Sequence, residues 1–197
     1  MTIKYNLPAL NNQHINNEIN CVYNAFIHEV GCWKGEFKIK LLIIAEAPLS
    51  CNKYFYRPHI GNFLISLRDF FDVDQKDLLK TLRQKGVFVL DLYKYPIRTE
   101  YYDNDKNHKL FDPKWFCNNL KLLGNAGLLD GNTKIVFRYK KLISRFEDMK
   151  TKIIRIPCIN PGCLLRDSEG KMVSLNSQEI PKKILSNEVI NYLNQLT

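Results

Sequence analysis

Three proline-containing segments carry polar side chains of the kinds that do chemistry. They are Glu46-Ala47-Pro48-Leu49-Ser50, Asp91-Leu92-Tyr93-Lys94-Tyr95-Pro96 and Asn160-Pro161-Gly162-Cys163-Leu164-Leu165-Arg166. A carboxylate such as Asp91 can orient or deprotonate a water molecule, and an amide such as Asn160 can donate a hydrogen bond to an oxygen that gains negative charge. Because proline stiffens each segment by fixing φ, we expect these polar groups to point into one shared crevice.

A short apolar run leads into each of these segments. Four runs rich in β-branched and aromatic residues, typical of strands buried on both faces, lie at 39–47, 86–93, 133–139 and 152–159. Amphipathic patterns predict helices at 13–31, 60–71, 75–84, 113–123, 140–148 and 178–195. This alternation predicts an α/β fold, a three-layer α/β/α sandwich with a central, mainly parallel four-stranded sheet. In such sheets ligands bind at the carboxyl ends of the strands, where the three segments begin.

The composition is typical of one soluble domain. The chain has 197 residues, of which 45% are hydrophobic and 25% are charged, and this length suffices to bury a core. No stretch approaches the roughly 20 apolar residues that span a membrane, and the first residues lack the apolar core of a signal peptide. We expect a single domain over residues 1–197 and a cytoplasmic monomer without membrane association.

The net charge favours an acidic polymer as partner. The chain has 29 Lys and Arg against 20 Asp and Glu, which gives a formal charge of +9. A basic surface gains affinity by neutralising phosphates, so we consider a nucleic acid as the partner. The alternative is a basic surface that only keeps the protein in solution, and charge alone does not decide between the two.

The cysteines and histidines have no spacing typical of a metal site. None of the six cysteines belongs to a Cys-x-x-Cys pair, and a chain of this length needs no disulfides to stabilise its core. We therefore expect reduced thiols and no metal site.

The order and spacing of the motifs resemble the uracil-DNA glycosylase superfamily, and most closely its iron–sulfur microbial branch. That branch has Gly-Glu-Ala-Pro-Gly and, with eight residues between this proline and the next motif, Arg-Pro-Phe-x-Gly. This chain has Ala-Glu-Ala-Pro at 45–48 and, after eight residues, Arg-Pro-His-Ile-Gly at 57–61. The second motif of the branch resembles residues 89–96, and its His-Pro-(Ser/Ala)-x-Leu-Leu-Arg motif resembles residues 160–166. The resemblance extends over about residues 40 to 166.

The resemblance implies a pocket for a flipped base. Enzymes of that family extrude a base from DNA, because its glycosidic bond cannot be reached inside the stack. Glu46, Ala47 and Pro48 would line the pocket, and His59 stands where the family has the aromatic residue that stacks on the base. For Glu46 the alternative is a carboxylate that caps the following turn, and for His59 it is a residue that packs near a helix start.

Three residues are the expected catalytic residues. Asp91 replaces the asparagine that, in the family, forms hydrogen bonds with the edge of the base. In its ionised form Asp91 would accept a hydrogen bond from an exocyclic amine, which argues against strict uracil recognition. Alternatively, Asp91 would orient or deprotonate a water molecule. Asn160 replaces the histidine that donates to the leaving base, and an amide can still donate, although more weakly. His59 would stack on the base or donate a proton.

The resemblance also implies contacts with DNA. Leu164 or Leu165 would fill the space that the flipped base vacates, and Arg166 would contact a phosphate. Lys94 matches a lysine of the family and would be a second phosphate contact. Arg57, from the Arg-Pro pair, is also expected at the DNA.

No cofactor is expected. Only Cys117 stands where the branch has a cluster ligand, and Tyr95 replaces another of its cysteines; four thiolates are the usual requirement for an iron–sulfur cluster. The expected function is that of a divergent DNA glycosylase, a hydrolase of base-excision DNA repair. The alternative is an inactive protein that binds a nucleic acid or a nucleobase on the same fold, because each recognition position is altered.

Overall fold

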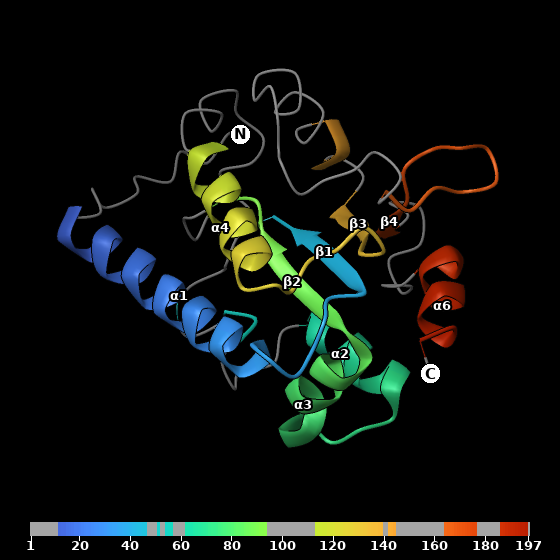
Figure 1. Cartoon of the computed structure of the whole chain (residues 1–197), viewed down its shortest axis with the longest axis horizontal. Coiled ribbons are helices and arrows are strands. Elements are labelled where there is room, and N and C mark those ends of the chain that lie inside the picture. The colour runs from blue at the N-terminus through green and yellow to red at the C-terminus, as the bar shows by residue number, and fades with distance from the viewer. Residues whose placement is uncertain are drawn as a thin grey trace, which may run out of the picture.

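A four-stranded parallel sheet forms the centre of the protein (Figure 1). The computed structural model describes residues 12–46, 51, 54–56, 62–93, 113–139, 142–144, 164–176 and 186–196. The strand order is β2-β1-β3-β4, and every neighbouring pair is parallel. The strands are β1 (Leu41–Ala45), β2 (Val87–Asp91), β3 (Lys134–Tyr139) and β4 (Ser174–Asn176). The predicted α/β class with a parallel sheet is confirmed.

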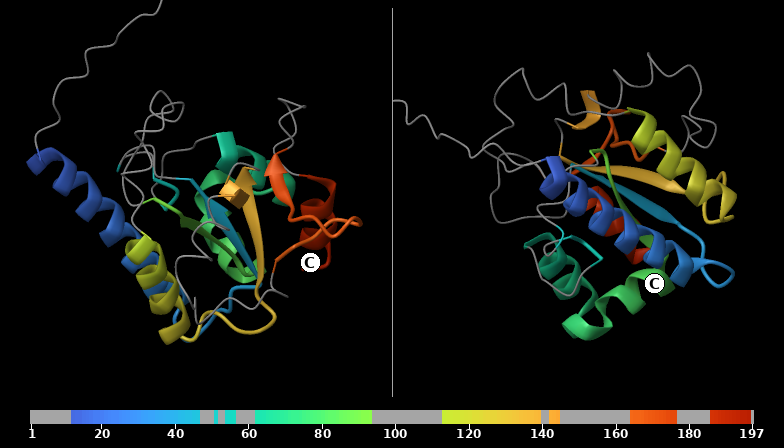
Figure 2. Two further views of the ribbon diagram at one scale, coloured as in Figure 1. Left: turned by 90° about the horizontal axis from the view of Figure 1, so that it is seen from above. Right: turned by 90° about the vertical axis from the view of Figure 1, so that its left-hand side faces the viewer.

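Helices cover both faces of the sheet. They are α1 (Asn12–Trp33), α2 (Asn62–Phe71), α3 (Gln75–Lys85), α4 (Pro113–Asn125) and α6 (Asn187–Asn194). Residues of α1 and α4 pack in one core cluster, and residues of α2, α3 and α6 pack in another. The two clusters lie on opposite faces of the sheet, so the structure has the three layers of an α/β/α sandwich (Figure 2). We call these faces the α1/α4 face and the α2/α3/α6 face.

The pleat of β1 sends alternate side chains to the two faces. Leu42 and Ile44 belong to the cluster on the α1/α4 face, whereas Leu41, Ile43 and Ala45 belong to the cluster on the α2/α3/α6 face. All five residues are buried, as expected for a central strand of a parallel sheet. Because a slip by one residue would exchange the two sets, this pattern fixes the register of the strand.

A glycine aligns β2 with β1. Gly86 follows the last residue of α3 with φ of 75°, a left-handed conformation that favours glycine. Its carbonyl oxygen accepts hydrogen bonds from the backbone nitrogens of Lys40 (2.8 Å) and Leu41 (2.9 Å). A Cβ at this position would lie 2.9 Å from the carbonyl oxygen of Lys38. The turn from α3 into β2 therefore fits only a glycine and holds β2 against the start of β1.

Most predicted elements agree with the structure. The helices α1, α2, α3 and α4 begin and end within two residues of those predicted at 13–31, 60–71, 75–84 and 113–123. β1, β2 and β3 lie inside the strands predicted at 39–47, 86–93 and 133–139. Of the remaining predictions, α6 lies within 178–195, residues 142–144 are helical within 140–148, and 152–159 lies outside the described residues. β4 lies outside every predicted strand, because three residues are too few to show a period.

Candidate active site

One row of three residues lies at the carboxyl ends of β2, β1 and β3. Ala45 pairs with Asp91 across β1 and β2. On the other side of β1, Ile44 pairs with Phe137 of β3. The next residues of those two strands, Ala45 and Arg138, therefore lie side by side. The row runs Asp91, Ala45, Arg138 at the carboxyl ends of the strands, the edge at which parallel sheets bind ligands.

The side chains of this row point to the α2/α3/α6 face. Ala45 belongs to the core cluster on that face. Asp91 follows Val89, which belongs to the same cluster two residues earlier, and strand side chains alternate with a period of two. The guanidinium carbon of Arg138 lies 4.8 Å from the ring centroid of Phe63 in α2, so Arg138 reaches the same face. An acid and a base thus flank a small methyl group.

Asp91 is buried and carries a perturbed carboxyl group. Its exposed fraction is 5%, and its pKa is raised from the ordinary value to about 7. Burial is the main cause, the charge of Arg138 lowers the pKa in part, and the charge of Glu46 raises it further. Near neutral pH Asp91 therefore exists in both forms, and its neutral form donates as well as accepts. The base that Asp91 would contact stays a prediction.

Glu46 lies next to Asp91 at the end of β1. The backbone pairing of the sheet continues past the strands, because the nitrogen of Leu92 donates to the oxygen of Ala45 and the nitrogen of Tyr93 donates to the oxygen of Glu46, both at 2.9 Å. Glu46 has an exposed fraction of 8%, and its charge acts on Asp91. Two carboxyl groups thus lie at neighbouring strand ends, one on the last residue of β2 and one on the residue after β1.

Aromatic residues close the outer side of β2. The hydroxyl group of Tyr56 donates to the carbonyl oxygen of Val89 (2.7 Å) and accepts from its nitrogen (2.9 Å). Tyr54 is buried and packs edge-on against Tyr56, with 5.6 Å between ring centroids. Burial, followed by the charge of Asp91, raises the pKa of Tyr54 well above its ordinary value, which keeps this hydroxyl neutral. Both rings therefore pack beside the sheet.

Arg138 is a residue of this edge that the sequence argument did not single out. It belongs to the run RYKKLISR at 138–145, which is more often the solvated face of a helix. In the structure Arg138 still belongs to β3, and its guanidinium carbon also lies 5.0 Å from the ring centroid of Tyr139. Its place at the end of the third predicted strand is the signal that could have found it.

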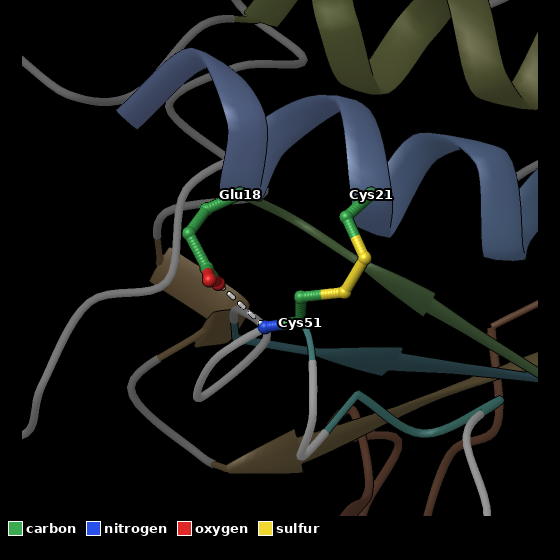
Figure 3. The surroundings of a disulfide bond; sticks show 3 residues. All are labelled: Glu18, Cys21 and Cys51. Carbon is green, nitrogen blue, oxygen red and sulfur yellow. Dashed lines mark hydrogen bonds between the residues drawn. A yellow bond between two sulfur atoms is a disulfide. The ribbon is translucent and has the colours of Figure 1, made fainter. Parts of the chain in front are cut away.

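A disulfide connects α1 to the segment after β1. Cys21 and Cys51 are bonded, with 5.8 Å between their Cα atoms, and the side chain of Glu18 accepts a hydrogen bond of 2.6 Å from the backbone nitrogen of Cys51 (Figure 3). Cys51 follows Glu46 by five residues, so the bond anchors the chain close to the candidate site. The expectation of reduced thiols is wrong for this pair, because spacing in the sequence does not reveal which cysteines the fold brings together.

The predicted DNA-contacting residues Leu164, Leu165 and Arg166 occupy three different environments. Leu164 is 7% exposed, belongs to the core cluster on the α1/α4 face and bridges to Ile135. Leu165 is partly buried against the other cluster. Arg166 is exposed and donates a hydrogen bond of 2.5 Å to the carbonyl oxygen of Gly170. Leu164 would have to leave the core to enter DNA, so of the two leucines only Leu165 keeps an exposed part for that role.

Of the predicted pocket and catalytic residues, the structure brings Glu46 and Asp91 together. The other predicted site residues lie outside the described residues: Ala47, Pro48, Arg57, His59, Lys94 and Asn160. Whether these residues converge on one site with Glu46 and Asp91 stays a prediction.

Comparisons of the chain with protein-family models, with curated proteins and with solved structures found no match. Among the described residues, no group of three or more histidine, cysteine, aspartate or glutamate side chains could hold a metal ion. In the same part of the chain, no helix combines the length and the apolar character needed to cross a membrane.

Proposed function

We propose that this chain is a divergent DNA glycosylase of the uracil-DNA glycosylase superfamily. It hydrolyses the N-glycosidic bond of a flipped base, deaminated or damaged, in DNA. The observation that carries the proposal is the buried carboxyl group of Asp91, with a pKa of about 7, at the carboxyl end of β2. Such a group takes up and releases protons near neutral pH, as a general base must. In the motif that the chain resembles, this position contacts the base.

In the proposed reaction, water replaces the base on the sugar. The bond between the sugar carbon C1′ and the base nitrogen breaks, and its electron pair leaves with the base. Ionised Asp91 orients a water molecule and takes its proton as the water oxygen bonds to C1′. The proton held by Asp91 is then released to solvent and the base nitrogen takes up one proton from water, so the products are the free base and an abasic sugar.

Because Asp91 has two protonation states near neutral pH, several bases are candidate substrates. In its alternative role, a contact with the base in place of the water, Asp91 would donate to a keto oxygen when neutral and accept from an exocyclic amine when ionised. Because the pKa of Asp91 is about 7, neither form is excluded near neutral pH. Uracil, hypoxanthine and xanthine therefore belong among the tested substrates beside alkylated bases.

Base release from oligonucleotides tests the proposal. Single- and double-stranded substrates carry uracil, hypoxanthine, xanthine or an alkylated base, and the rate constant of release is measured. We expect release of one of these bases, at a rate that rises with pH through about 7 as Asp91 ionises. In Asp91→Asn, whose amide cannot take up the proton, the rate constant should fall about 10²-fold or more.

A matched variant separates chemistry from charge. Asp69→Asn makes the same change in α2, where the Asp69 carboxylate is exposed and pairs with the neighbouring Arg68 at 2.6 Å. We expect Asp69→Asn to release base at the wild-type rate. Equal rates in Asp91→Asn and the wild type, or no release from any substrate, contradict the proposed activity.

The net charge of +9 supports a second candidate, a protein that binds DNA on the same fold without turnover. Its affinity for DNA would fall steeply with salt, because phosphate contacts release counterions, and no base would be released. If the protein binds no DNA even at low salt, both candidates are wrong. In either case we propose DNA as the partner of a monomer that acts in the cytoplasm.

A further inference from the structure

A positive charge ends the central strand β3 beside the candidate site. Arg138 and Asp91 flank Ala45 in the row described above. Neighbouring strands lie about 4.8 Å apart, so the backbones of Arg138 and Asp91 are about 10 Å apart. The residue between them carries only a methyl group. Ala45 is buried in the core cluster of the α2/α3/α6 face, so the row places a carboxyl group and a guanidinium on either side of a methyl group.

Aromatic rings hold the guanidinium of Arg138. Its central carbon lies 4.8 Å from the ring centroid of Phe63 and 5.0 Å from that of Tyr139. Contacts of this kind attract a cation to the ring face and do not neutralise its charge. Phe63 is itself buried in the core cluster, so the guanidinium rests on a fixed support.

The charge of Arg138 influences Asp91 without a salt bridge between the two side chains. Asp91 and Arg138 are both among the described residues, and the ion pairs of that part of the chain include no direct contact between them. The charge of Arg138 nevertheless favours the ionised form of Asp91. It is therefore close enough to influence a reacting group and is not bound in a salt bridge with this acid.

The proposed reaction needs a positive charge at this place. When the glycosidic bond breaks, its electron pair leaves the base with negative charge, and the carboxylates of Glu46 and Asp91 would oppose that charge. The histidine that stabilises the leaving base in the family is replaced by Asn160, and an amide carries no charge. A fixed cation in a site with little water is worth far more than in solution.

We propose that Arg138 stabilises the negative charge that develops on the leaving base. This inference rests on the proposed glycosylase function and adds a catalytic residue to it. Arg138 donates hydrogen bonds to an oxygen or nitrogen of the base and keeps its own protons, because a guanidinium does not titrate in this range. The water proton passes to Asp91, and the base nitrogen is protonated after the bond has broken.

The dependence of the rate on the leaving base tests this role. The base released in the assay above is compared with a halogenated analogue that leaves more easily, such as 5-fluorouracil for uracil. We expect Arg138→Gln to lower the rate constant about 10²-fold for the parent base, and by clearly less for the analogue, which needs less help. Arg138→Lys, which keeps the charge, should lose less than Arg138→Gln and keep the ratio between the two bases near the wild-type ratio.

Two controls make the outcomes distinct. Arg68→Gln removes a charge from the exposed pair with Asp69 and should leave both rates unchanged. If Arg138→Gln does not fold, Arg138→Met, whose apolar stem keeps the packing on Phe63, takes its place. If the variant slows both bases equally, or neither, Arg138 is not the stabilising group and the glycosylase function stands. If the wild type releases no base, the function and the role of Arg138 are both overturned.

Discussion

At the scale of single residues, the burial of Asp91 has a cost for the folded protein. Its folded-state pKa of about 7 lies above the value of about 4 in the unfolded chain. Between these two values the folded state binds more protons than the unfolded state, so the free energy of unfolding falls as the pH rises.

This cost predicts that Asp91→Asn stabilises the protein at high pH. The amide cannot ionise, so the variant should exceed the wild type in free energy of unfolding by up to about 4 kcal/mol above pH 7. The difference should shrink as the pH falls toward 4. Urea unfolding of both proteins at several pH values measures it. A difference that does not change with pH would show that the carboxyl group of Asp91 is not held in its neutral form by the fold.

At the scale of elements, a buried acid joins two helical layers. Glu29 of α1 is 3% exposed, and its carboxylate accepts hydrogen bonds from Trp33 (2.9 Å) and from Arg83 of α3 (2.8 and 3.2 Å). Because α1 and α3 cover opposite faces of the sheet, this contact passes around its outer strand, β2. It connects the layers that the sheet separates.

Removing the α3 side of this contact should destabilise the protein. Arg83→Met keeps an apolar side chain but removes both hydrogen bonds from the guanidinium to the buried carboxylate of Glu29. Of the hydrogen bonds described above, only the one from the indole of Trp33 is left. We therefore expect the free energy of unfolding to fall by about 2 kcal/mol. Arg68→Met, which breaks an exposed pair, should cost less than about 1 kcal/mol. Urea unfolding compares the two variants. Equal losses would mean that burial of Glu29 adds nothing to the pair.

The elements differ in how well the sequence predicts them. The runs that form β1, β2 and β3 contain enough apolar residues to show a period, and the helices around them have clear amphipathic patterns. β4 is too short to show one. Glu46 and Asp91 could be predicted as neighbours, because both end strands of a parallel sheet. The same reasoning could have found Arg138, because it lies at the end of the third predicted strand. It could not have found the disulfide, because the pairing of Cys21 with Cys51 depends on distances across the fold.

At the scale of the whole molecule, the disulfide constrains the unfolded chain. Cys21 and Cys51 are separated by 30 residues, and the closed loop includes the last part of α1 and all of β1. Closing a loop of this length lowers the entropy of the unfolded state. The bond also holds Cys51 against α1 (Figure 3).

Reduction of this bond should lower the free energy of unfolding by about 3 kcal/mol. Thermal or urea unfolding with and without a thiol reductant measures the change. The double variant Cys21→Ser/Cys51→Ser should resemble the reduced wild type and should not respond to the reductant. A wild-type protein that is equally stable in both conditions would contradict a stabilising role for the bond. Disulfides rarely persist in the cytosol. Unfolding of protein taken directly from cells, with and without the reductant, therefore tests the proposed location, because a cytosolic protein should contain the reduced thiols and should not respond to the reductant.

The hydroxyl group of Tyr56 also occupies backbone groups at the open edge of β2. β2 is an outer strand of the described sheet, and the backbone of Val89 in its middle points away from β1 to meet this hydroxyl. An outer strand with free backbone groups is a template on which another chain can add a strand and start aggregation. Tyr56 occupies the donor and the acceptor at the centre of that template, so this border of the sheet is protected from growth by a side chain of its own.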